Sequence, residues 1–350
     1  FSFNQMDMTM KALSVTQMFP APGVRDARTT LSERAVDVSE QEIAMTRESL
    51  SRRARLLYLD LHDIEQALVI VSENQALLET FIRISEARYR TGGGIQQDIL
   101  KARLEHSRLT EKAIHLEAGR ESARSTMNLL RGRPAGEEFE LVGLPQPGAP
   151  LPAAEDLFSM AQVNNPVLRK ASAMVAQSEA ATALAERSTR PAWSAATSYS
   201  QRDGGRKDLL SASVMVQVPF WTGRKQARAV DEREALTRET LYRQQEMELG
   251  ILDSIYRLQS RFEESRRLIG LYASEIIPES EGVLNSALAG YQVGQVNFLT
   301  LLSAQATLFN YQLESIRVMT DYHRHLIEME AVLGTAIPGT GIDELSGNRS

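Results

Sequence analysis

The chain contains no cysteine, which excludes disulfides, thiolate metal sites and cysteine nucleophiles. It has no run of about 18 apolar residues, so no membrane-spanning helix is expected. Lysine and arginine are interspersed with aspartate and glutamate at a net charge of -6, which argues against a nucleic-acid-binding surface. No pairing of a nucleophile with a base and no cluster of carboxylates stands out, so we expect neither an enzyme nor a bound cofactor or metal.

One long segment lacks helix breakers. Between residues 25 and 87 there is neither proline nor glycine, and residues of high helix propensity dominate. At about 1.5 Å per residue this helix would be roughly 90 Å long, which is too long for a compact domain. Its apolar residues recur at mixed steps of three, four and seven, as in supercoiled helices: Leu57, Leu61, Ile64, Leu68, Val71, Leu78, Ile82 and Tyr89.

Glycine and proline divide the rest of the chain. Three glycines at 92–94 end the first helix, and a second helix is expected at about 96–130. Five of the 12 prolines fall within 134–152 and indicate a linker. We therefore predict a first unit at 1–133, a linker at 134–153, a second unit at 154–335 and a flexible tail at 336–350.

The second unit is predicted to hold a strand hairpin between helices. One strand starts at Pro191, a turn follows at 203–205, and a second strand returns over 210–218. The helices are expected at about 154–186 with an interruption near 164–166, at 224–277, at 278–288 and at 297–333. Residues 8–19 alternate with period two and predict a further strand.

The hairpin strands carry apolar and aromatic residues on one face and small polar residues on the other. This alternation is typical of strands in a transmembrane barrel, although a half-buried strand of a soluble sheet gives a similar pattern. The long neighbouring helices favour the membrane, because they leave the hairpin no soluble core. The predicted membrane-facing residues are Trp193, Tyr199, Leu210, Val214 and Val216.

Two parts of the chain share the same order of features. Tyr89-Arg90-Thr91-Gly92 is followed 202 residues later by Tyr291-Gln292-Val293-Gly294, each at a turn between long helices. We predict two internal repeats. Residue 1 corresponds to a point well inside the second repeat, so we expect the first repeat to be truncated or processed at its start.

On these residues the chain resembles the TolC-type outer-membrane efflux proteins. The resemblance spans about 7–335. It rests on the duplicated strand–Pro–Gly–helix junction, the paired Tyr-x-x-Gly turns, the Leu-Leu-Ser-Ala-Gln-Ala segment at 301–306 and the closing Leu-Gly at 333–334. It implies an α+β fold in which membrane β-barrel hairpins continue into a long coiled-coil α-helical barrel. It also implies a homotrimer, since an open sheet edge is not tolerated in lipid. The junction at 17–23 is similar to the heavy-metal branch of the family.

The resemblance further suggests how the tunnel closes. The family holds its closed end through an acid in the first unit that contacts a tyrosine and an arginine in the second. Asp98 and Tyr291 match the acid and the tyrosine, whereas Val296 stands at the position of the arginine. We hypothesise a latch between Asp98 and Tyr291. The alternative is that Asp98 is only an acid favoured by the helix dipole.

The constriction of the tunnel differs from that of the family. Thr300 and Ser303 stand where the family has two acids, so the acidic ring is missing here. We expect packing of Leu299 and Leu302 to contribute to closure instead.

Four residues of the two turns are candidates for docking a periplasmic adaptor protein: Tyr89, Gly92, Tyr291 and Gly294. A simpler interpretation is that tyrosine covers the helix seam and that glycine supplies the positive φ of the turn. Both interpretations are compatible, because the turns would form the exposed tip.

Methionine and histidine offer weak metal candidates. Met6, Met8 and Met10 share one strand face, but methionine is more often an apolar gap filler than a Cu(I) ligand. His323 and His325 are two residues apart and therefore lie on different helix faces. The remaining histidines are isolated in the sequence: His62, His106 and His115.

The predicted function is a passive, trimeric exit duct of a tripartite efflux pump. Its expected partners are a periplasmic adaptor protein, an inner-membrane pump and outer-membrane lipid. Its expected location is the outer membrane of a Gram-negative bacterium, with an extension into the periplasm. The alternatives are the outer-membrane component of type I protein secretion and a soluble coiled-coil scaffold. A stable monomer in plain buffer would exclude the channel.

Overall fold

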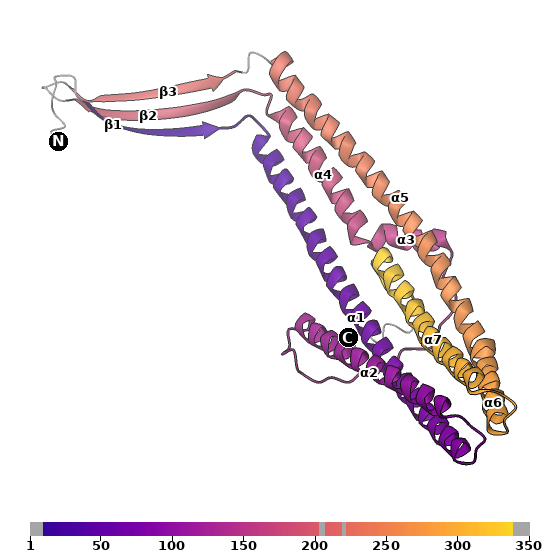
Figure 1. Ribbon diagram of the computed structural model, residues 1–350. Helices are drawn as coiled ribbons and strands as arrows, with labels where there is room; N and C mark the ends of the chain where they lie inside the picture. Colours follow the sequence, from indigo (N-terminus) through magenta and orange to yellow (C-terminus); the bar gives the residue numbers. More distant parts are fainter. Residues whose placement is uncertain (1–9, 203–206, 219–221, 339–350) are drawn as a thin grey trace. The chain divides into compact units, whose positions relative to one another are not determined.

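The computed structural model describes residues 10–202, 207–218 and 222–338, which form long helices and one small sheet (Figure 1). The helices are α1 (Val24–Arg90), α2 (Gln96–Leu130), α3 (Ala154–Asn164), α4 (Pro166–Arg187), α5 (Ala227–Leu271), α6 (Ile277–Gln292) and α7 (Phe298–Leu333). The strands are β1 (Met10–Phe19), β2 (Ala192–Arg202) and β3 (Leu209–Gln217). Met6, Met8, the turn expected at 203–205 and most of the expected tail lie outside the described residues.

The long helix predicted from the lack of glycine and proline is present as the 67-residue α1. The predicted second helix coincides with α2. The predicted interruption near 164–166 separates α3 from α4, where Asn165 is extended and Pro166 opens the next helix.

The helix break expected at Pro278 is wrong. A π-helical turn, η2 (Tyr272–Ile276), links α5 directly to α6, and Pro278 lies in the first turn of α6. The N–H of Ile277 donates to the carbonyl of Tyr272, five residues earlier, so the hydrogen-bond pattern is already shifted at the point where proline lacks its N–H. The short helix expected to end at 288 also runs to Gln292, so Tyr291 is helical.

The described chain forms two compact units, each built from two separate stretches. The sheet unit comprises Phe1–Met45 and Pro166–Leu249, and the bundle unit comprises Thr46–Asn165 and Gly250–Ser350. This division differs from that of the expected repeats, because each unit combines parts of both.

In the sheet unit, the strands pair antiparallel in the order β1-β2-β3 (Figure 1). The register places Trp193 opposite both Phe19 and Val216. The rings of Phe19 and Trp193 stack with their centroids 4.0 Å apart. Residues directly opposite one another point to the same side of a sheet, so these pairings define which residues share a face.

The helices of the sheet unit bury few side chains. On α4 the buried residues are small or medium-sized, and Lys170 forms an ion pair with Glu42 at 2.8 Å. Large apolar side chains remain exposed on the neighbouring helices, among them Val36, Ile43 and Tyr242. The described residues of this unit therefore leave apolar helix surface uncovered.

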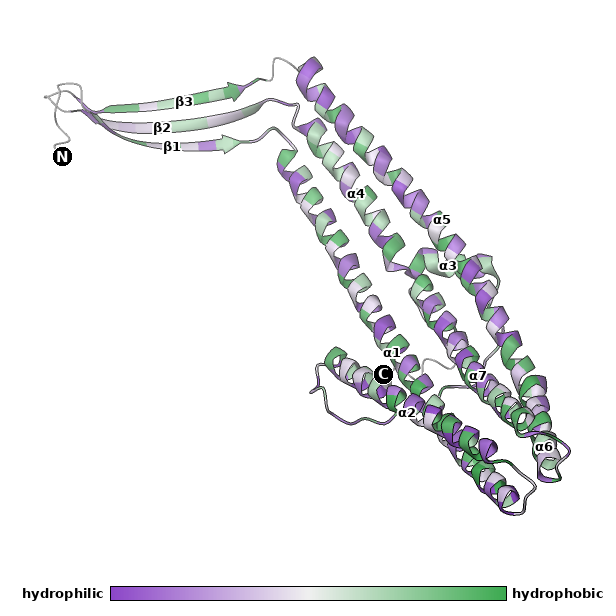
Figure 2. Ribbon diagram, viewed as in Figure 1, coloured by the Kyte–Doolittle hydropathy of each residue, from purple (hydrophilic) through white to green (hydrophobic). Residues whose placement is uncertain are grey.

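The bundle unit has two apolar clusters. One combines residues of α1, α3, α5 and α7 around Phe262 and Tyr322, whose ring centroids are 4.7 Å apart. The other combines residues of α1, α2, α6 and α7 around Phe81 and Tyr291. Figure 2 shows apolar residues recurring along each helix, as the period read from the sequence requires. Among the described residues, no helix has both the length and the apolarity needed to cross a membrane.

The proline-rich linker is tied to the bundle unit by tyrosines. The hydroxyl of Tyr58 on α1 donates to the carbonyl of Val142, and the N–H of Gly148 donates to the hydroxyl of Tyr322 at 3.0 Å. Because this segment has no regular structure, these bonds position its backbone against α1 and α7.

Candidate functional site

The two Tyr-x-x-Gly turns of the bundle unit are built alike. The N–H of Gly92 donates to the carbonyl of Tyr89, and the N–H of Gly294 donates to the carbonyl of Tyr291, both at 3.1 Å. The two glycines have φ angles of 75° and 80°, in the left-handed region that other residues rarely adopt. Each turn therefore needs glycine where the sequence provides it.

Tyr291 is the most enclosed residue of these turns, with 2% of its surface exposed. Its hydroxyl donates to Oδ2 of Asp98 at 3.2 Å and lies 3.1 Å from the hydroxyl of Ser85. Its ring packs edge-on against Phe298 with centroids 5.4 Å apart. The structure thus brings together the acid and the tyrosine of the predicted latch, and it adds Ser85.

The surroundings of Tyr291 keep its hydroxyl protonated. Burial raises the pKa of Tyr291, and the carboxylate of Asp98 raises it further, whereas Ser85 and Arg88 act in the opposite direction. A phenol with a raised pKa keeps its proton at physiological pH and can donate a hydrogen bond to a carboxylate oxygen. In the contact with Asp98, a neutral phenol therefore donates a hydrogen bond to a side-chain oxygen.

Arg88 also belongs to this group, although it was not among the residues predicted from the sequence. Its guanidinium lies 4.5 Å from the centre of the Tyr291 ring. It donates to the carbonyl of Tyr291, and its Nη2 donates to the carbonyl of Gly93 at 2.7 Å. A comparison of the two turns could have drawn attention to it, because position 88 corresponds to Gly290 in the second turn.

The other residues expected at the constriction lie at the start of α7. Leu299 is 59% exposed, whereas Leu302 packs against the cluster around Phe81 and Tyr291. Thr300 donates from its N–H and its hydroxyl to the side chain of Asn297, at 2.9 and 3.0 Å, and so belongs to the helix cap. Ser303 is exposed.

Tyr89, the counterpart of Tyr291, is 49% exposed. Gly92, Gly93 and Gly294 are exposed as well. The two turns therefore present backbone and one aromatic ring to their surroundings.

The five residues predicted to face the membrane share one side of the sheet. Tyr199 lies opposite Leu210, and Trp193 lies opposite Val216, so the strand register aligns them. All five side chains are exposed, including Val214 at 72%. The opposite side carries serines, and the hydroxyls of Ser198 and Ser211 lie 2.7 Å apart across it. It also exposes the apolar side chains of Met18, Leu209 and Met215, so the face expected to be small and polar is only partly so.

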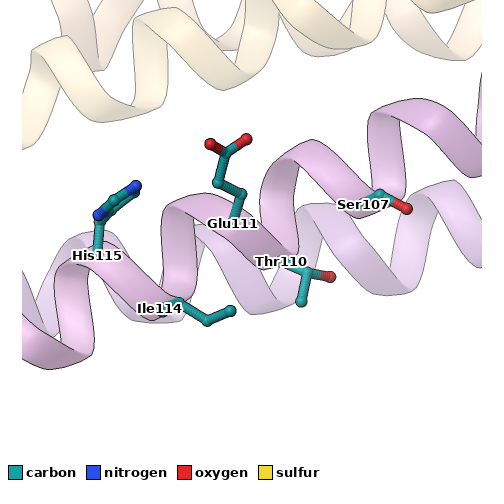
Figure 3. Close-up of a pocket in the computed structure, with 5 residues that line it drawn as sticks. All are labelled: Ser107, Thr110, Glu111, Ile114 and His115. Carbon is teal, nitrogen blue, oxygen red and sulfur yellow. The ribbon is translucent and has the colours of Figure 1, made fainter.

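A hollow of about 310 Å³ lies along α2 and is lined by Ser107, Thr110, Glu111, Ile114 and His115. Figure 3 shows these five side chains. All five residues come from one helix, and the side chains of Ile114 and His115 point away from each other in this view. Groups on one helix surface cannot enclose a ligand. Within the described ranges, no three histidine or acidic side chains converge as a metal site would require.

Two histidines that the sequence placed apart are neighbours. His323 on α7 is buried, with 1% exposed, and it lies close enough to His62 on α1 for their charges to interact. The expectation that His62 is isolated is therefore wrong, because the pairing of α1 with α7 could not be read from spacing. The pKa of His323 is lowered to about 4, mainly by burial and also by His62, whereas a hydrogen bond to the backbone of Pro145 opposes the shift.

Comparisons with known proteins show similarity to outer-membrane efflux proteins. The family described as outer membrane efflux protein matches residues 157–335. The cobalt-zinc-cadmium resistance protein CzcC of Cupriavidus metallidurans is 18% identical over 319 residues, which cover 89% of this chain and 74% of that protein.

Solved structures of outer-membrane proteins have a similar fold. The outer-membrane channel OprN superposes with a TM-score of 0.78 at 16% identity, over 94% of this chain and 81% of that chain. The outer membrane protein VceC of Vibrio cholerae superposes with a TM-score of 0.76 at 14% identity, over 93% of this chain and 87% of that chain.

Proposed function

The chain belongs to the outer membrane efflux protein family, and from this membership we propose that three copies of it form the exit duct of a tripartite efflux pump. The chain is an outer-membrane efflux channel that extends into the periplasm, as its family and its structural relatives indicate. Its family and fold are those of channel proteins and not of enzymes. The trimer, the partners and the gate described below are our proposals.

The strand sheet is proposed to form part of a membrane barrel that three copies build together. The single observation that carries this proposal is the apolar face of Trp193, Tyr199, Leu210, Val214 and Val216, which no described residue covers. A water-soluble scaffold would leave this face in contact with water. Lipid would cover it, and strands of neighbouring copies would satisfy the free edges of β1 and β3.

The helices are proposed to form a hollow barrel by association of copies. Supporting this idea, the sheet unit exposes apolar side chains on α1 and α5, such as Val36 and Tyr242. Contacts between copies would cover such surfaces, as in coiled coils. The matching Tyr–Gly hydrogen bonds of the Gly92 and Gly294 turns likewise support two repeats, at 1–133 and 154–335, that contribute equivalent hairpins.

The turns are proposed to form the gated tip of the duct. In the closed state, the hydroxyl of Tyr291 holds Asp98, while Leu299, Thr300, Leu302 and Ser303 line the start of α7 near the constriction. The exposed backbone of Gly92 and Gly294 suits docking of a periplasmic adaptor, because glycine allows a partner to approach closely. Energy for transport would come from an inner-membrane pump.

Divalent metal cations are the first class of cargo to test. The reason is the relative named for cobalt, zinc and cadmium resistance. Deletion in the native host should reduce tolerance to such cations if the pump exports metals. Unchanged metal tolerance together with reduced drug tolerance would assign another cargo. Loss of a secreted protein with normal tolerances would favour type I secretion.

The oligomer and the channel can be tested together. The purified chain should require detergent, should have the mass of three copies by native mass spectrometry, and should conduct ions in planar bilayers. A stable monomer in plain buffer would contradict the proposal and favour a scaffold.

A further inference from the structure

Arg88 contacts both turns of the proposed tip from a single position. It lies in the last turn of α1, and its guanidinium donates to the carbonyl of Gly93 in the first turn and to the carbonyl of Tyr291 at the end of α6. The same group covers the ring of Tyr291. The backbone carbonyls at helix C-termini carry partial negative charge, so a cation between two such ends is favourable.

Each turn pairs a large residue with a glycine six positions away, but in opposite order: Arg88 precedes Gly94 in the first turn, and Gly290 precedes Val296 in the second. In the first turn, a Cβ at Gly94 would lie 3.1 Å from Cβ of Arg88. In the second turn, a Cβ at Gly290 would lie 2.6 Å from Cγ2 of Val296. These positions correspond across the 202-residue spacing, and the large and small residues are exchanged. Only the first turn can therefore hold a long cationic side chain, and Val296 leaves the second turn without one.

We propose that Arg88 is the cationic positioning residue that holds the two turns together in the closed tip. This inference rests on the proposed channel function. It identifies the residue whose positive charge lies between the two turns. Arginine suits this task because its planar guanidinium presents several donors in fixed directions and can bond to two carbonyls at once. Lysine has a single ammonium group on a flexible chain and does not reproduce that geometry.

The closed-state conductance of the full-length trimer in planar bilayers, without an adaptor, tests the proposal. Arg88→Gln should shift the ratio of open to closed tips about tenfold, equivalent to about 1.4 kcal/mol. Arg88→Lys should recover only part of the closure. Arg90→Gln is the matched control, because Arg90 is an exposed arginine two residues further along the same helix end. It should leave the conductance unchanged.

A second variant keeps the charge of Arg88 and disturbs its position. Gly94→Ala brings a methyl group against the Arg88 side chain and should also open the tip. Gly282→Ala is its control, since a Cβ there would meet nothing within 4 Å and Gly282 makes no contact with Arg88 among the described residues. If Arg88→Gln does not assemble, the comparison of these two alanine variants decides the matter.

Three results would overturn the proposal. They are equal conductance of Arg88→Gln and Arg90→Gln, full recovery by Arg88→Lys, and equal conductance of the two alanine variants. If the wild-type protein forms no conducting trimer, the channel function fails instead, and this outcome is distinguishable from failure of the Arg88 proposal alone.

Discussion

Tyr291 at the end of α6 donates a hydrogen bond to Asp98 in the first turn of α2, a residue 193 positions earlier in the chain. The bond joins the two hairpins at their turns. It is the contact that the proposed gate would have to break when the tip opens.

Removal of either partner should therefore weaken closure. Asp98→Ala and Tyr291→Phe should each raise the closed-state conductance in bilayers, because a hydrogen bond to a charged group contributes about 1.5–3 kcal/mol. The double variant should be little worse than either single one, since both remove the same interaction. Glu111→Ala, an exposed acid on the same helix, should have no effect. An unchanged current in Asp98→Ala would refute the latch.

Gly290 is expected to tolerate no side chain. Gly290→Ala would place Cβ 2.6 Å from Cγ2 of Val296, and such overpacking destabilises by about 1–3 kcal/mol. Thermal unfolding of the trimer should show a lower midpoint, and the additional change Val296→Ala should restore it. Gly282→Ala, in the open part of the same helix, should be neutral or slightly stabilising. Equal midpoints for the two alanine variants would argue against a steric role of Val296.

The two faces of the sheet should respond differently to charge. Val214→Arg places a cation on the face proposed to meet lipid, which is unfavourable by about 2–4 kcal/mol at mid-membrane. The amount of protein in the outer-membrane fraction should fall. Ser213→Arg, the neighbouring residue on the opposite face, should insert normally and alter ion conductance. Normal insertion of Val214→Arg would mean that this face does not contact lipid.

His323 should make the protein less stable in acid. Its pKa is lowered to about 4 in the folded chain, below an unfolded value of 6.5. The unfolded chain therefore takes up the proton first as the pH falls, so stability present above pH 6.5 is lost between pH 6.5 and about 4. The loss is at most about 3 kcal/mol.

Thermal unfolding midpoints at pH 7, 5.5 and 4 test this expectation. His323→Leu should flatten the pH dependence, whereas His115→Leu, an exposed histidine on α2, should keep it. Parallel curves for the wild type and His323→Leu would show that His323 does not cause the acid sensitivity.

Local sequence features predicted much of the fold. The absence of breakers between 25 and 87 predicted α1, and the three glycines at 92–94 predicted where it ends. The alternation of serine with apolar residues predicted the shared face that the register of β2 and β3 displays. The family and its efflux function, inferred from the paired turns, are confirmed by the comparisons.

Contacts between distant helices were harder to predict. The pairings of His62 with His323 and of Arg88 with Tyr291 depend on how each helix is rotated about its axis, and residue spacing within one helix contains no such information. The continuity across Pro278 was missed for another reason. A π-helical turn shifts the hydrogen-bond pattern just before the point where the proline lacks its N–H.

The two edge strands of the sheet set a condition on ring closure. Because β1 and β3 are both antiparallel to β2, they run in the same direction. Direct joining of β3 in one copy to β1 in the next would create a parallel junction at every subunit boundary, whereas outer-membrane barrels consist of antiparallel strands. One further strand per copy, running opposite to both edges, would make every junction antiparallel. If three copies close a barrel as proposed, a fully antiparallel wall would therefore need an even number of strands from each copy.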